Sequence, residues 1–579
     1  MEYKLLEGSS NNILKPIETV LLNRGIEDYE HYLNLTEDDI ESWEDLDNID
    51  EAVECFVKHF TNFNTIAILS DCDPDGATSS VIMWKYIKMM QEDYPVFLVV
   101  HENNKSHGLA SWDFTLPSNT KLLIIPDAAT NDINECQELI DKGISVICLD
   151  HHIKSDERTN PAIVVNNQIS DRYYNKEACG AHITYDFLRA LDEYYWNDYA
   201  DQFVDLVALA DLSDVMDIKS ESTRAMINYG LQNISNKMFK EIIKAQDFSM
   251  KGVINPHTVT FYCTPLINSF IRLATYDERV LLLRAFCEDE SETFDYTKRG
   301  EDFPIEENIY EHVVRLMKSY KSKQDRYRDK SIKLIMNKVS ECASDKVAII
   351  DATEEIEGPL TGLVAIRISE KINKPVLLVR AHDGALSGSG RAFDNCPVED
   401  FRGLVEENPY MSWGQGHSTA FGCELPSENI ELAKQWFNEK LKDVNMEKIY
   451  HVDFLLDIDE LEIGMIQEID KNQGLWGHGV DEPLIAVENI KIPHSDIHVQ
   501  GKNFDSITFT VNDIKFVQFK LPEDDALLAW ASDWEKDDDD IIIINVVGTV
   551  GINAYKGVYT PQFTIKDSEI TIQNYYKES

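Results

Sequence analysis

The chain is 579 residues long, which is enough for about four domains of ordinary size, and 43% of its residues are hydrophobic, which excludes a mainly disordered protein. It carries 54 basic and 103 acidic residues, so its formal net charge is −49. This charge excludes a uniformly cationic surface for nucleic acid. Any phosphate or nucleic-acid site must be a local basic region or must use metal ions to offset the acidity.

The first residues contain no apolar signal segment, and no run is apolar and long enough to span a membrane. The ten cysteines form no C-x-x-C pair, which excludes a zinc knuckle and a thioredoxin-like motif. Most of them stand in apolar stretches, where a buried, reduced thiol is expected. We therefore expect a soluble, cytoplasmic protein that does not contact membranes and is a monomer.

Residues 1–60 indicate short helices. From Thr65 onwards, strand-length apolar runs alternate with helix-length amphipathic segments, which is typical of a mostly parallel sheet with helices on both faces. The strands are expected at residues 65–70, 96–100, 121–126, 145–149 and 162–165. The helices are expected at residues 77–90, 131–142, 178–193 and 199–212.

Residues 220–340 are expected to be helical and to end in a long charged helix. A second, smaller α/β segment begins at Lys346, and short strands over the last 130 or so residues favour a small sandwich or barrel. The chain is therefore predicted to be a multidomain α/β protein. Its five parts are expected at residues 1–60, 61–235, 236–340, 341–442 and 443–579.

Acidic residues and histidines follow several of the expected strands directly. They are Asp71, Asp73, Asp75, Asp127, Asp150, His151 and His152, with Asp211 and Asp214 at the end of a helix. Ligands of open parallel sheets bind at the carboxyl ends of the strands, so we expect these side chains to converge. A single Asp after a strand is often only a helix cap. So many carboxylates together need cations, and oxygen ligands with some imidazole suit Mn²⁺ or Mg²⁺.

These motifs resemble the signature of the DHH phosphoesterase superfamily, which is named for the sequence found here as Asp150-His151-His152. Within it, the chain is similar to the RecJ-type single-strand-specific 5′→3′ DNA exonucleases. Residues 265–272 are similar to a further motif of that group, and residues 388–391 and 416–422 to its DHHA1 domain. The C-terminal β region, with residues 548–550, resembles its OB-fold DNA-binding domain.

The resemblance implies a parallel-sheet DHH domain joined by a long helix to a smaller α/β DHHA1 domain, followed by an OB-like β-barrel. It implies hydrolysis of single-stranded DNA to 5′-mononucleotides, in DNA repair, recombination or replication, with two divalent cations, Mn²⁺ or Mg²⁺. The implied metal ligands are Asp73, Asp75, Asp127, His151 and Asp214. Asp71 and His152 are the implied catalytic neighbours, with His152 placed to contact the scissile phosphate.

Candidate substrate-binding residues come from the same motifs and from basic segments. They are Lys105, His107, Asn268, Arg272, Lys318, Arg326, Ser389, Arg391 and His417. Residues 315–333 carry eight basic and two acidic residues, so this helix either lines the path of the DNA strand or is a solvated face. Tyr320 and Tyr327 within it either pack or stack on bases. The turn with Ser389 and Arg391 either grips a phosphate or is a plain β-turn.

Three departures from the family pattern stand out. Leu266 replaces an arginine and Phe270 a small residue, and no arginine precedes Gly108, where Lys105 or His107 would have to bind a 5′-phosphate. Our hypothesis is a divergent, virus-encoded member whose partners are single-stranded DNA and a single-strand-binding protein or helicase. Three alternatives remain: a DHH phosphodiesterase for short oligonucleotides or RNA, a catalytically inactive Cdc45-like replication scaffold, and an acidic DNA mimic.

Overall fold

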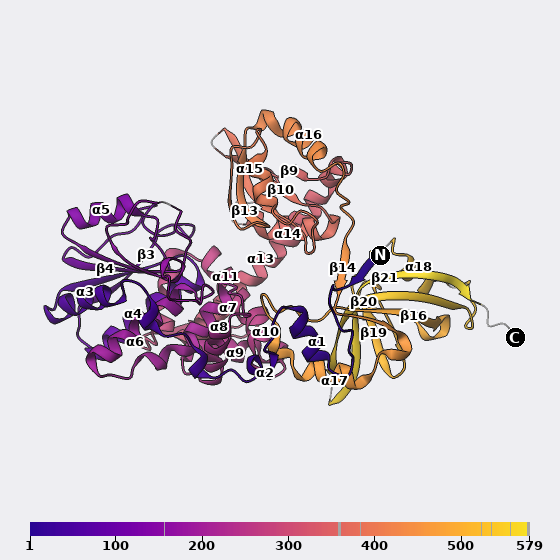
Figure 1. Ribbon diagram of the computed structural model, residues 1–579, viewed down its shortest axis with the longest axis horizontal. Coiled ribbons are helices and arrows are strands. Elements are labelled where there is room, and N and C mark those ends of the chain that lie inside the picture. The colour runs from indigo at the N-terminus through magenta and orange to yellow at the C-terminus, as the bar shows by residue number, and fades with distance from the viewer. Residues whose placement is uncertain are drawn as a thin grey trace. The chain divides into compact units, whose positions relative to one another are not determined.

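The computed structural model describes residues 1–155, 157–356, 360–382, 384–522, 524–533, 535–555 and 557–575. The chain forms two compact units (Figure 1). The first, which we call the DHH unit after its sequence Asp150-His151-His152, comprises Arg24–Ser322 and Gln473–Glu482. The second, the C-terminal unit, comprises Met1–Asn23, Lys323–Asn472 and Pro483–Ser579. The long helix α13 (Ile309–Val339), which the charged stretch predicts, contributes residues to both.

The DHH unit is built on a five-stranded parallel sheet in the order β3-β2-β4-β5-β6. Its strands are β2 (Thr65–Ser70), β3 (Val96–Val100), β4 (Thr120–Pro126), β5 (Ser145–Asp150) and β6 (Ile163–Asn166). The predicted parallel sheet is thereby confirmed, with strand ends within one residue of those expected. The four central residues of β4, 122–125, are completely buried, so the sheet must be covered on both faces.

Helices cover both faces of this sheet. They are α3 (Ile49–Thr61), α4 (Pro74–Met90), α5 (Ile133–Asp141), α6 (Gly180–Tyr195) and α7 (Val204–Ser213). Figure 1 shows α5 on one side of the sheet and α3, α4 and α6 on the other. Cys136 and Leu139 of α5 pack against alternate residues of the strands, such as Leu123 and Ile125.

Small helices make up most of the rest of the DHH unit. They are α2 (Tyr29–Tyr32), α8 (Glu221–Gln232), α9 (Lys237–Met250), α10 (Pro256–Thr258), a π-helical turn (Val259–Cys263), α11 (Thr264–Leu273) and α12 (Tyr276–Phe286). The hairpin of β7 (Thr293–Tyr296) and β8 (Ile305–Asn308) interrupts the region that was expected to be entirely helical.

The C-terminal unit contains a second five-stranded sheet in the order β12-β13-β11-β10-β9. Its strands are β9 (Ala348–Asp351), β10 (Val376–His382), β11 (Ala385–Arg391), β12 (Trp413–Gly416) and β13 (Ala420–Leu425), and its helices are α14 (Thr361–Ile372), α15 (Phe401–Glu407) and α16 (Ile430–Lys440). Only β9 and β10 pair in parallel. This is the smaller α/β segment that the sequence predicts.

The last part of the chain forms a seven-stranded, mostly antiparallel sheet in the order β15-β16-β20-β21-β19-β18-β17. The strands are β15 (Phe454–Asp457), β16 (Ile485–Pro493), β17 (His498–Gln500), β18 (Ser506–Val511), β19 (Ile514–Gln518), β20 (Ile541–Tyr555) and β21 (Val558–Tyr575), with helices α17 (Ile463–Lys471) and α18 (Ala526–Ala531). In the described residues, β15 and β17 are not paired with each other, so the predicted barrel closure is not confirmed.

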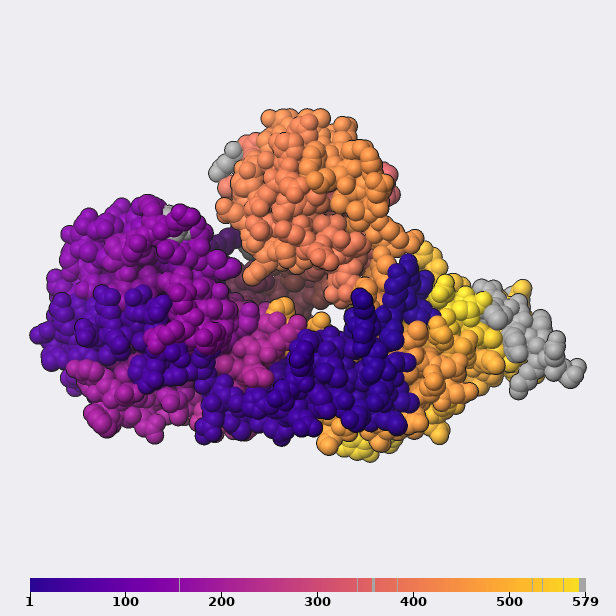
Figure 2. Space-filling model, viewed as in Figure 1, coloured from indigo at the N-terminus to yellow at the C-terminus, as the bar shows by residue number. Residues whose placement is uncertain are grey.

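The N-terminal residues belong to this C-terminal part. The strand β1 (Glu2–Leu5), which the sequence analysis did not predict, pairs in parallel with β14 (Ile449–Val452), and α1 (Pro16–Asn23) follows it. Figure 2 shows the indigo N-terminal residues against the orange and yellow C-terminal strands. None of the described helices combines the length and the apolar composition that crossing a membrane requires.

Candidate metal centre

The ends of β2, β4 and β5 bring the expected acidic residues and histidines together. Three groups have potential ligand atoms that all lie within 4.8 Å of one another: Asp127 with His151 and His152, Asp75 with His151 and Asp214, and Asp71 with Asp73 and Asp127. The groups share Asp127 and His151 and therefore form one cluster. All seven residues that were predicted as metal ligands or catalytic neighbours belong to it.

His151 lies in the middle of this cluster. Its Nε2 atom is 3.2 Å from Oδ1 of Asp127, 3.5 Å from Oδ2 of Asp214 and 3.8 Å from Oδ2 of Asp75. Burial, followed by the charge of His152, lowers the pKa of His151 to about 4. The imidazole is therefore neutral at ordinary pH, which is the form that binds a metal ion.

Asp127 provides the test of whether a cation fits here. Its side chain is 1% exposed, yet neither carboxylate oxygen accepts a hydrogen bond, and the contact with His151 lacks hydrogen-bond geometry. Leaving a buried carboxylate without donors is costly. A divalent cation between Asp127 and its carboxylate neighbours removes that cost, so the residues present fit such an ion.

Two glycines let the backbone approach the cluster closely. A Cβ atom on Gly180 would lie 2.5 Å from Cβ of Asp127, and one on Gly76 would lie 2.5 Å from Cβ of Asp71. Because Gly180 opens α6, the first amides of this helix reach Asp75, whose carboxylate accepts hydrogen bonds from Gly180 N at 2.6 Å and Ala181 N at 2.7 Å. The sequence analysis singled out neither Gly180 nor Ala181.

The buried carboxylate of Asp150 accepts several hydrogen bonds from neighbouring residues. It accepts hydrogen bonds from the backbone amides of Thr130, His151 and His152, at 2.8 to 3.1 Å, and from Nδ1 of His152 at 2.8 Å. Burial by itself would raise the pKa of Asp150, but the hydrogen bond and charge of His152, with the charge of His151, hold it well below its ordinary value. Asp150 therefore positions His152, whose Nε2 atom remains for other contacts.

Replacing Asp150 by asparagine is expected to lower the free energy of unfolding by about 2 kcal/mol, because an amide nitrogen cannot accept from the buried donors around it. Urea denaturation of the metal-free protein measures this. Asp141→Asn, which changes an exposed carboxylate at the end of α5, is the control, with an expected change within about 0.5 kcal/mol. A urea midpoint for Asp150→Asn equal to that of the unmodified protein would contradict the role given to Asp150.

His107 joins the cluster through Asp71. Its Nδ1 atom hydrogen-bonds to the Asp71 carboxylate, and its ring centroid lies 4.8 Å from that of His152. His101, which the sequence analysis did not select, is fully buried 3.7 Å from the same carboxylate and is hydrogen-bonded to Asp113. Lys105 is exposed on the loop between these histidines.

The carboxyl groups of the cluster repel one another. Burial, followed by the charges of neighbouring aspartates, raises the pKa of Asp75 to about 7 and that of Asp214 to about 8, and raises that of Asp127 well above its ordinary value. At neutral pH, the metal-free cluster therefore retains protons. A divalent cation offsets the same repulsion by replacing those protons.

This predicts how the stability of the metal-free protein depends on pH. Between pH 4 and 8 or so, the folded chain holds protons on Asp75 and Asp214 that the unfolded chain has lost, so the contribution of these two carboxyl groups to stability falls as the pH rises. Stabilisation by Mn²⁺, which competes with these protons, is expected to grow over the same range. Melting temperatures at several pH values, with a chelator and with Mn²⁺, measure both effects. An Mn²⁺-induced shift that is equal at pH 5 and pH 8 would contradict the prediction.

Arg272 and Asn268 of α11 lie in the same unit. The Arg272 side chain is exposed overall, yet partial burial lowers the pKa of its guanidinium group, and the charge of Asp73 acts in the opposite direction. At the start of α11, the hydroxyl of Thr264 is 3.4 Å from that of Ser213, which directly precedes Asp214. Both predicted residues are thus on a helix that is bound to the end of α7, beside the cluster.

Ser389, Arg391 and His417 belong to the C-terminal unit. Ser389 and Arg391 lie on β11, where the Ser389 hydroxyl is 3.0 Å from that of Thr361, and Arg391 donates to the carbonyl oxygens of Gly390 and Phe421. His417 is exposed in the turn between β12 and β13. The structure therefore brings Ser389 and Arg391 together in one sheet.

The basic stretch of α13 is partly used for internal contacts. Arg315 pairs with Glu307 and lies over the ring of Tyr296, and Arg328 pairs with Asp325 and Asp329. Tyr320 packs against Phe270 and donates to Glu278, and Tyr327 packs against a core cluster, so packing accounts for both tyrosines. The predicted DNA-contacting residues Lys318 and Arg326 are exposed.

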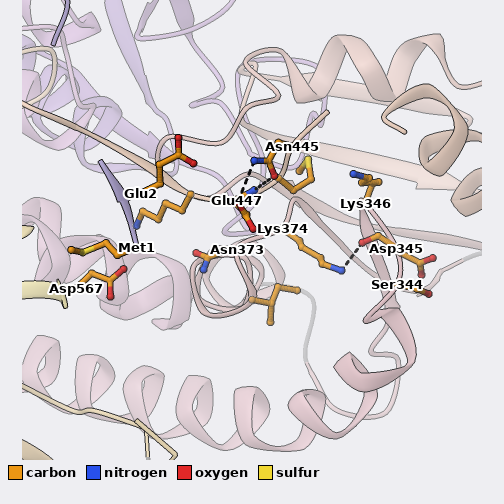
Figure 3. Close-up of a pocket in the computed structure, with 13 residues that line it drawn as sticks. Met1, Glu2, Ser344, Asp345, Lys346, Asn373, Lys374, Asn445, Glu447 and Asp567 are labelled. Atoms are coloured by element: carbon orange, nitrogen blue, oxygen red, sulfur yellow. Dashed lines mark hydrogen bonds between the residues drawn. The ribbon is translucent and has the colours of Figure 1, made fainter. Parts of the chain in front are cut away.

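A surface pocket of about 720 Å³ in the C-terminal unit contains none of the candidate site residues. Two of its lysines are bound by backbone carbonyl groups: Lys374 donates to Ala343 and to Asp345, the second of which Figure 3 shows, and Lys346 donates to Val444. Glu2, Asp345, Glu447 and Asp567 offset their charge. We assign no phosphate-binding role to this pocket.

Comparison with known proteins agrees with this architecture. Residues 65–210 match the family profile described as "DHH family, N-terminal domain", and residues 452–567 match the "RecJ OB domain". The chain belongs to the DHH family. It is 34% identical over 578 residues, covering 98% of each chain, to YorK of Bacillus subtilis (strain 168), a candidate single-strand DNA-specific exonuclease derived from the SPβ prophage.

More distant relatives carry the name RecJ. The single-stranded-DNA-specific exonuclease RecJ of Escherichia coli (strain K12) is 23% identical over 482 residues, covering 76% of this chain and 78% of that one. The crystal structure of RecJ in complex with Mn²⁺ from Thermus thermophilus has the same fold, with a TM-score of 0.72 and 18% identity, covering 98% of this chain and 78% of that one.

Proposed function

We propose that this protein is a metal-dependent exonuclease specific for single-stranded DNA, which digests from the 5′ end and releases 5′-mononucleotides in DNA repair, recombination or replication. The observation that carries the proposal is the buried Asp127 carboxylate, whose two oxygens accept no hydrogen bond at the centre of an Asp/His cluster. The full-length similarity to YorK, a candidate exonuclease for single-stranded DNA, supports the substrate.

The residues proposed to hold two divalent cations, Mn²⁺ or Mg²⁺, are Asp73, Asp75, Asp127, His151 and Asp214. When bound, such cations supply Lewis-acid activation of the phosphodiester and of the attacking water. The Mn²⁺ and Mg²⁺ complexes of the Thermus RecJ, which has the same fold, support this choice of metals.

Asp71 and His152 act beside these ligands in the proposal. Burial would lower the pKa of His152, but its hydrogen bond to Asp150 and the charges of Asp150, Asp214 and Asp73 raise it to about 9. His152 is therefore protonated at neutral pH, and with Nδ1 held by Asp150 its Nε2 atom can donate to a phosphate oxygen. Asp71 fixes the ring of His107, which lies against His152.

DNA contacts are proposed for the substrate-binding residues that the sequence predicts. Asn268 and Arg272 are on α11, Lys105 and His107 are on the loop that follows β3, and Lys318 and Arg326 are on α13. Ser389 and Arg391 are proposed to bind the terminal nucleotide, with His417 nearby in the same sheet. A single-strand-binding protein or helicase is the proposed protein partner, and the monomer is the proposed state.

Digestion of single-stranded DNA labelled at its 5′ or 3′ end tests this function. With Mn²⁺ present, we expect immediate release of label as mononucleotide from the 5′-labelled strand and progressive shortening of the 3′-labelled strand. Parallel reactions with RNA and with dinucleotides test the phosphodiesterase alternative. Binding of DNA without cleavage in any metal would contradict the enzyme proposal and would favour the scaffold.

A further inference from the structure

An exposed aromatic surface lies on the DHH unit beside the end of α7. Phe248, near the end of α9, is 97% exposed, and Phe261 and Tyr262 of the π-helical turn are 63% and 37% exposed. Helices α9, α10 and α11 lie together with α7 and α8 in this unit (Figure 1). Exposed aromatic side chains that gather on neighbouring elements mark an interaction surface more often than chance.

Charge indicates what this surface binds. Acidic residues make up 103 of the 579 residues, yet the longest stretch without one covers the 29 residues 248–276 and includes all three aromatics. Lys251, within this stretch, follows Phe248 by three residues at the end of α9. Lys240 and Lys244 stand at helical spacing with Phe248 on the exposed side of α9, before this stretch, and Lys244 is paired with Glu241 there. A surface that combines lysines with aromatic rings and lacks carboxylates in its own segment suits a polyanion with flat bases.

The surface also leads to the metal cluster. Pro256–Thr258, the π-helical turn and α11 form one continuous helix, whose solvent side carries Phe261 and Tyr262, then half-buried Asn268, and finally exposed Arg272 near Asp73. Eleven residues at 1.5 Å each separate Phe261 from Arg272 by about 16 Å. At 3.4 Å per stacked base, this distance corresponds to about five nucleotides.

The geometry of Phe261 suits stacking. His257, one turn earlier, stacks on one side of the ring with centroids 4.4 Å apart and an interplanar angle of 30°, while most of the Phe261 side chain remains exposed. His257 is half-buried and thereby restrains the ring. The π-helical turn, a conformation that is frequent at functional sites, places two adjacent aromatic residues on the solvent side.

We propose that Phe261 and Tyr262, together with Phe248 and Lys251, form a base-stacking track that holds single-stranded DNA about five nucleotides from Arg272, on the way to the metal cluster. This proposal rests on the proposed function, because it takes single-stranded DNA to be the substrate of the protein. It makes affinity depend on strand length, because short oligonucleotides occupy the cluster without reaching Phe261. It differs from the path along α13, because it uses Phe248, Lys251, Phe261 and Tyr262, none of which the sequence analysis selected.

Fluorescence anisotropy with 3′-labelled oligothymidylates tests the track. The double variant Phe261→Ala/Tyr262→Ala, in an Asp127→Asn background that slows digestion about 10³-fold, is expected to bind (dT)20 about 10- to 100-fold more weakly, from the loss of one or two stacked bases. For (dT)3, the double variant is expected to lose at most about twofold in affinity. Phe261→Trp, which keeps a flat ring at this position in the same background, is expected to retain tight binding of (dT)20.

Phe303→Ala is the matched control. Phe303 is another exposed phenylalanine of the same unit, but it follows Glu301 and Asp302, and its removal is expected to leave affinity unchanged. Equal affinity of the double variant and its parent for (dT)20 would overturn the proposal. Dissociation of a dimer by the double variant would also overturn it, since the surface would then bind a second copy of the chain.

The same proteins with Asp127 restored separate this proposal from the proposed function. Length-dependent loss of binding in a protein that cleaves no DNA would support the track and contradict the exonuclease. Cleavage of single-stranded DNA at undiminished affinity in the double variant would support the exonuclease and overturn the track.

Discussion

Replacing Asp127 by asparagine is expected to lower kcat for hydrolysis of single-stranded DNA about 10³-fold while leaving the metal-free protein at least as stable as the unmodified one. The loss of activity follows because a cation stabilises several kcal/mol of transition-state charge, and Asp127, like His151, belongs to two of the three ligand groups. Stability is retained because the substitution removes a buried carboxyl group from among four other aspartates that raise its pKa.

Single-turnover cleavage and thermal melting with a chelator measure these two effects. The asparagine variant should also lose most of the rise in melting temperature that Mn²⁺ produces in the unmodified protein. Asp93→Asn, which changes an exposed aspartate of the same unit, is the control and should match the unmodified protein in all three measurements. Cleavage by Asp127→Asn within a few-fold of the unmodified rate would contradict the assignment of Asp127 as a ligand.

The change Gly180→Ala is expected to abolish most activity without touching a ligand. The new methyl group would lie 2.5 Å from Cβ and 2.7 Å from Cα of Asp127, so either α6 or the Asp127 backbone must move. Overpacking of this kind costs about 2 kcal/mol of stability. Displacement of a catalytic group by about 1 Å lowers the rate about 100-fold, and the amides that Asp75 accepts from would move as well.

Cleavage rates and urea denaturation of Gly180→Ala measure these losses. Gly464→Ala is the matched control, because a methyl group on this helical glycine of α17 would have no atom within 4 Å, and alanine is the better helix former. We expect it to keep full activity and to gain up to about 1 kcal/mol of stability. Unchanged activity and stability in Gly180→Ala would mean that Asp127 tolerates displacement, contrary to the close packing described above.

The sheet of the DHH unit could be predicted because its signal is local. The runs that form β2 and β3 are continuous apolar segments between polar ones, and their predicted limits match the structure at both ends. The helix that follows β2 begins at Pro74, three residues before its predicted start. Asp73 accepts a hydrogen bond from the amide of Gly76, and Pro74 takes the first helical position, which extends the helix into the motif itself.

Elements held together by distant segments left little signal in the sequence. The strand β1 has only four residues with alternating exposure, and it forms because β14, more than 440 residues away, pairs with it. The hairpin of β7 and β8 is mostly exposed and has no apolar run. Tertiary pairing decides such elements, and a pattern within one segment does not show it.

The same distinction holds within the candidate site. Membership of the cluster could be predicted, because strand ends of a parallel sheet meet at one edge. The capping of α6 by Asp75, which lies about a hundred residues earlier in the chain, could not be predicted. The burial of His101 beside Asp71 could not be predicted either, although His101 stands in a segment in which the sequence analysis looked for a phosphate-binding residue. Sequence order places residues on elements, and the packing of those elements decides their contacts.

Titration of the chelator-treated protein with Mn²⁺, while mononucleotide release from single-stranded DNA is followed, tests the central claim most directly. The account predicts no release before Mn²⁺ is added and activity that reaches its maximum when two ions are bound per chain. Release at the full rate in the presence of chelator, or two bound Mn²⁺ ions with no hydrolysis of DNA, would contradict it.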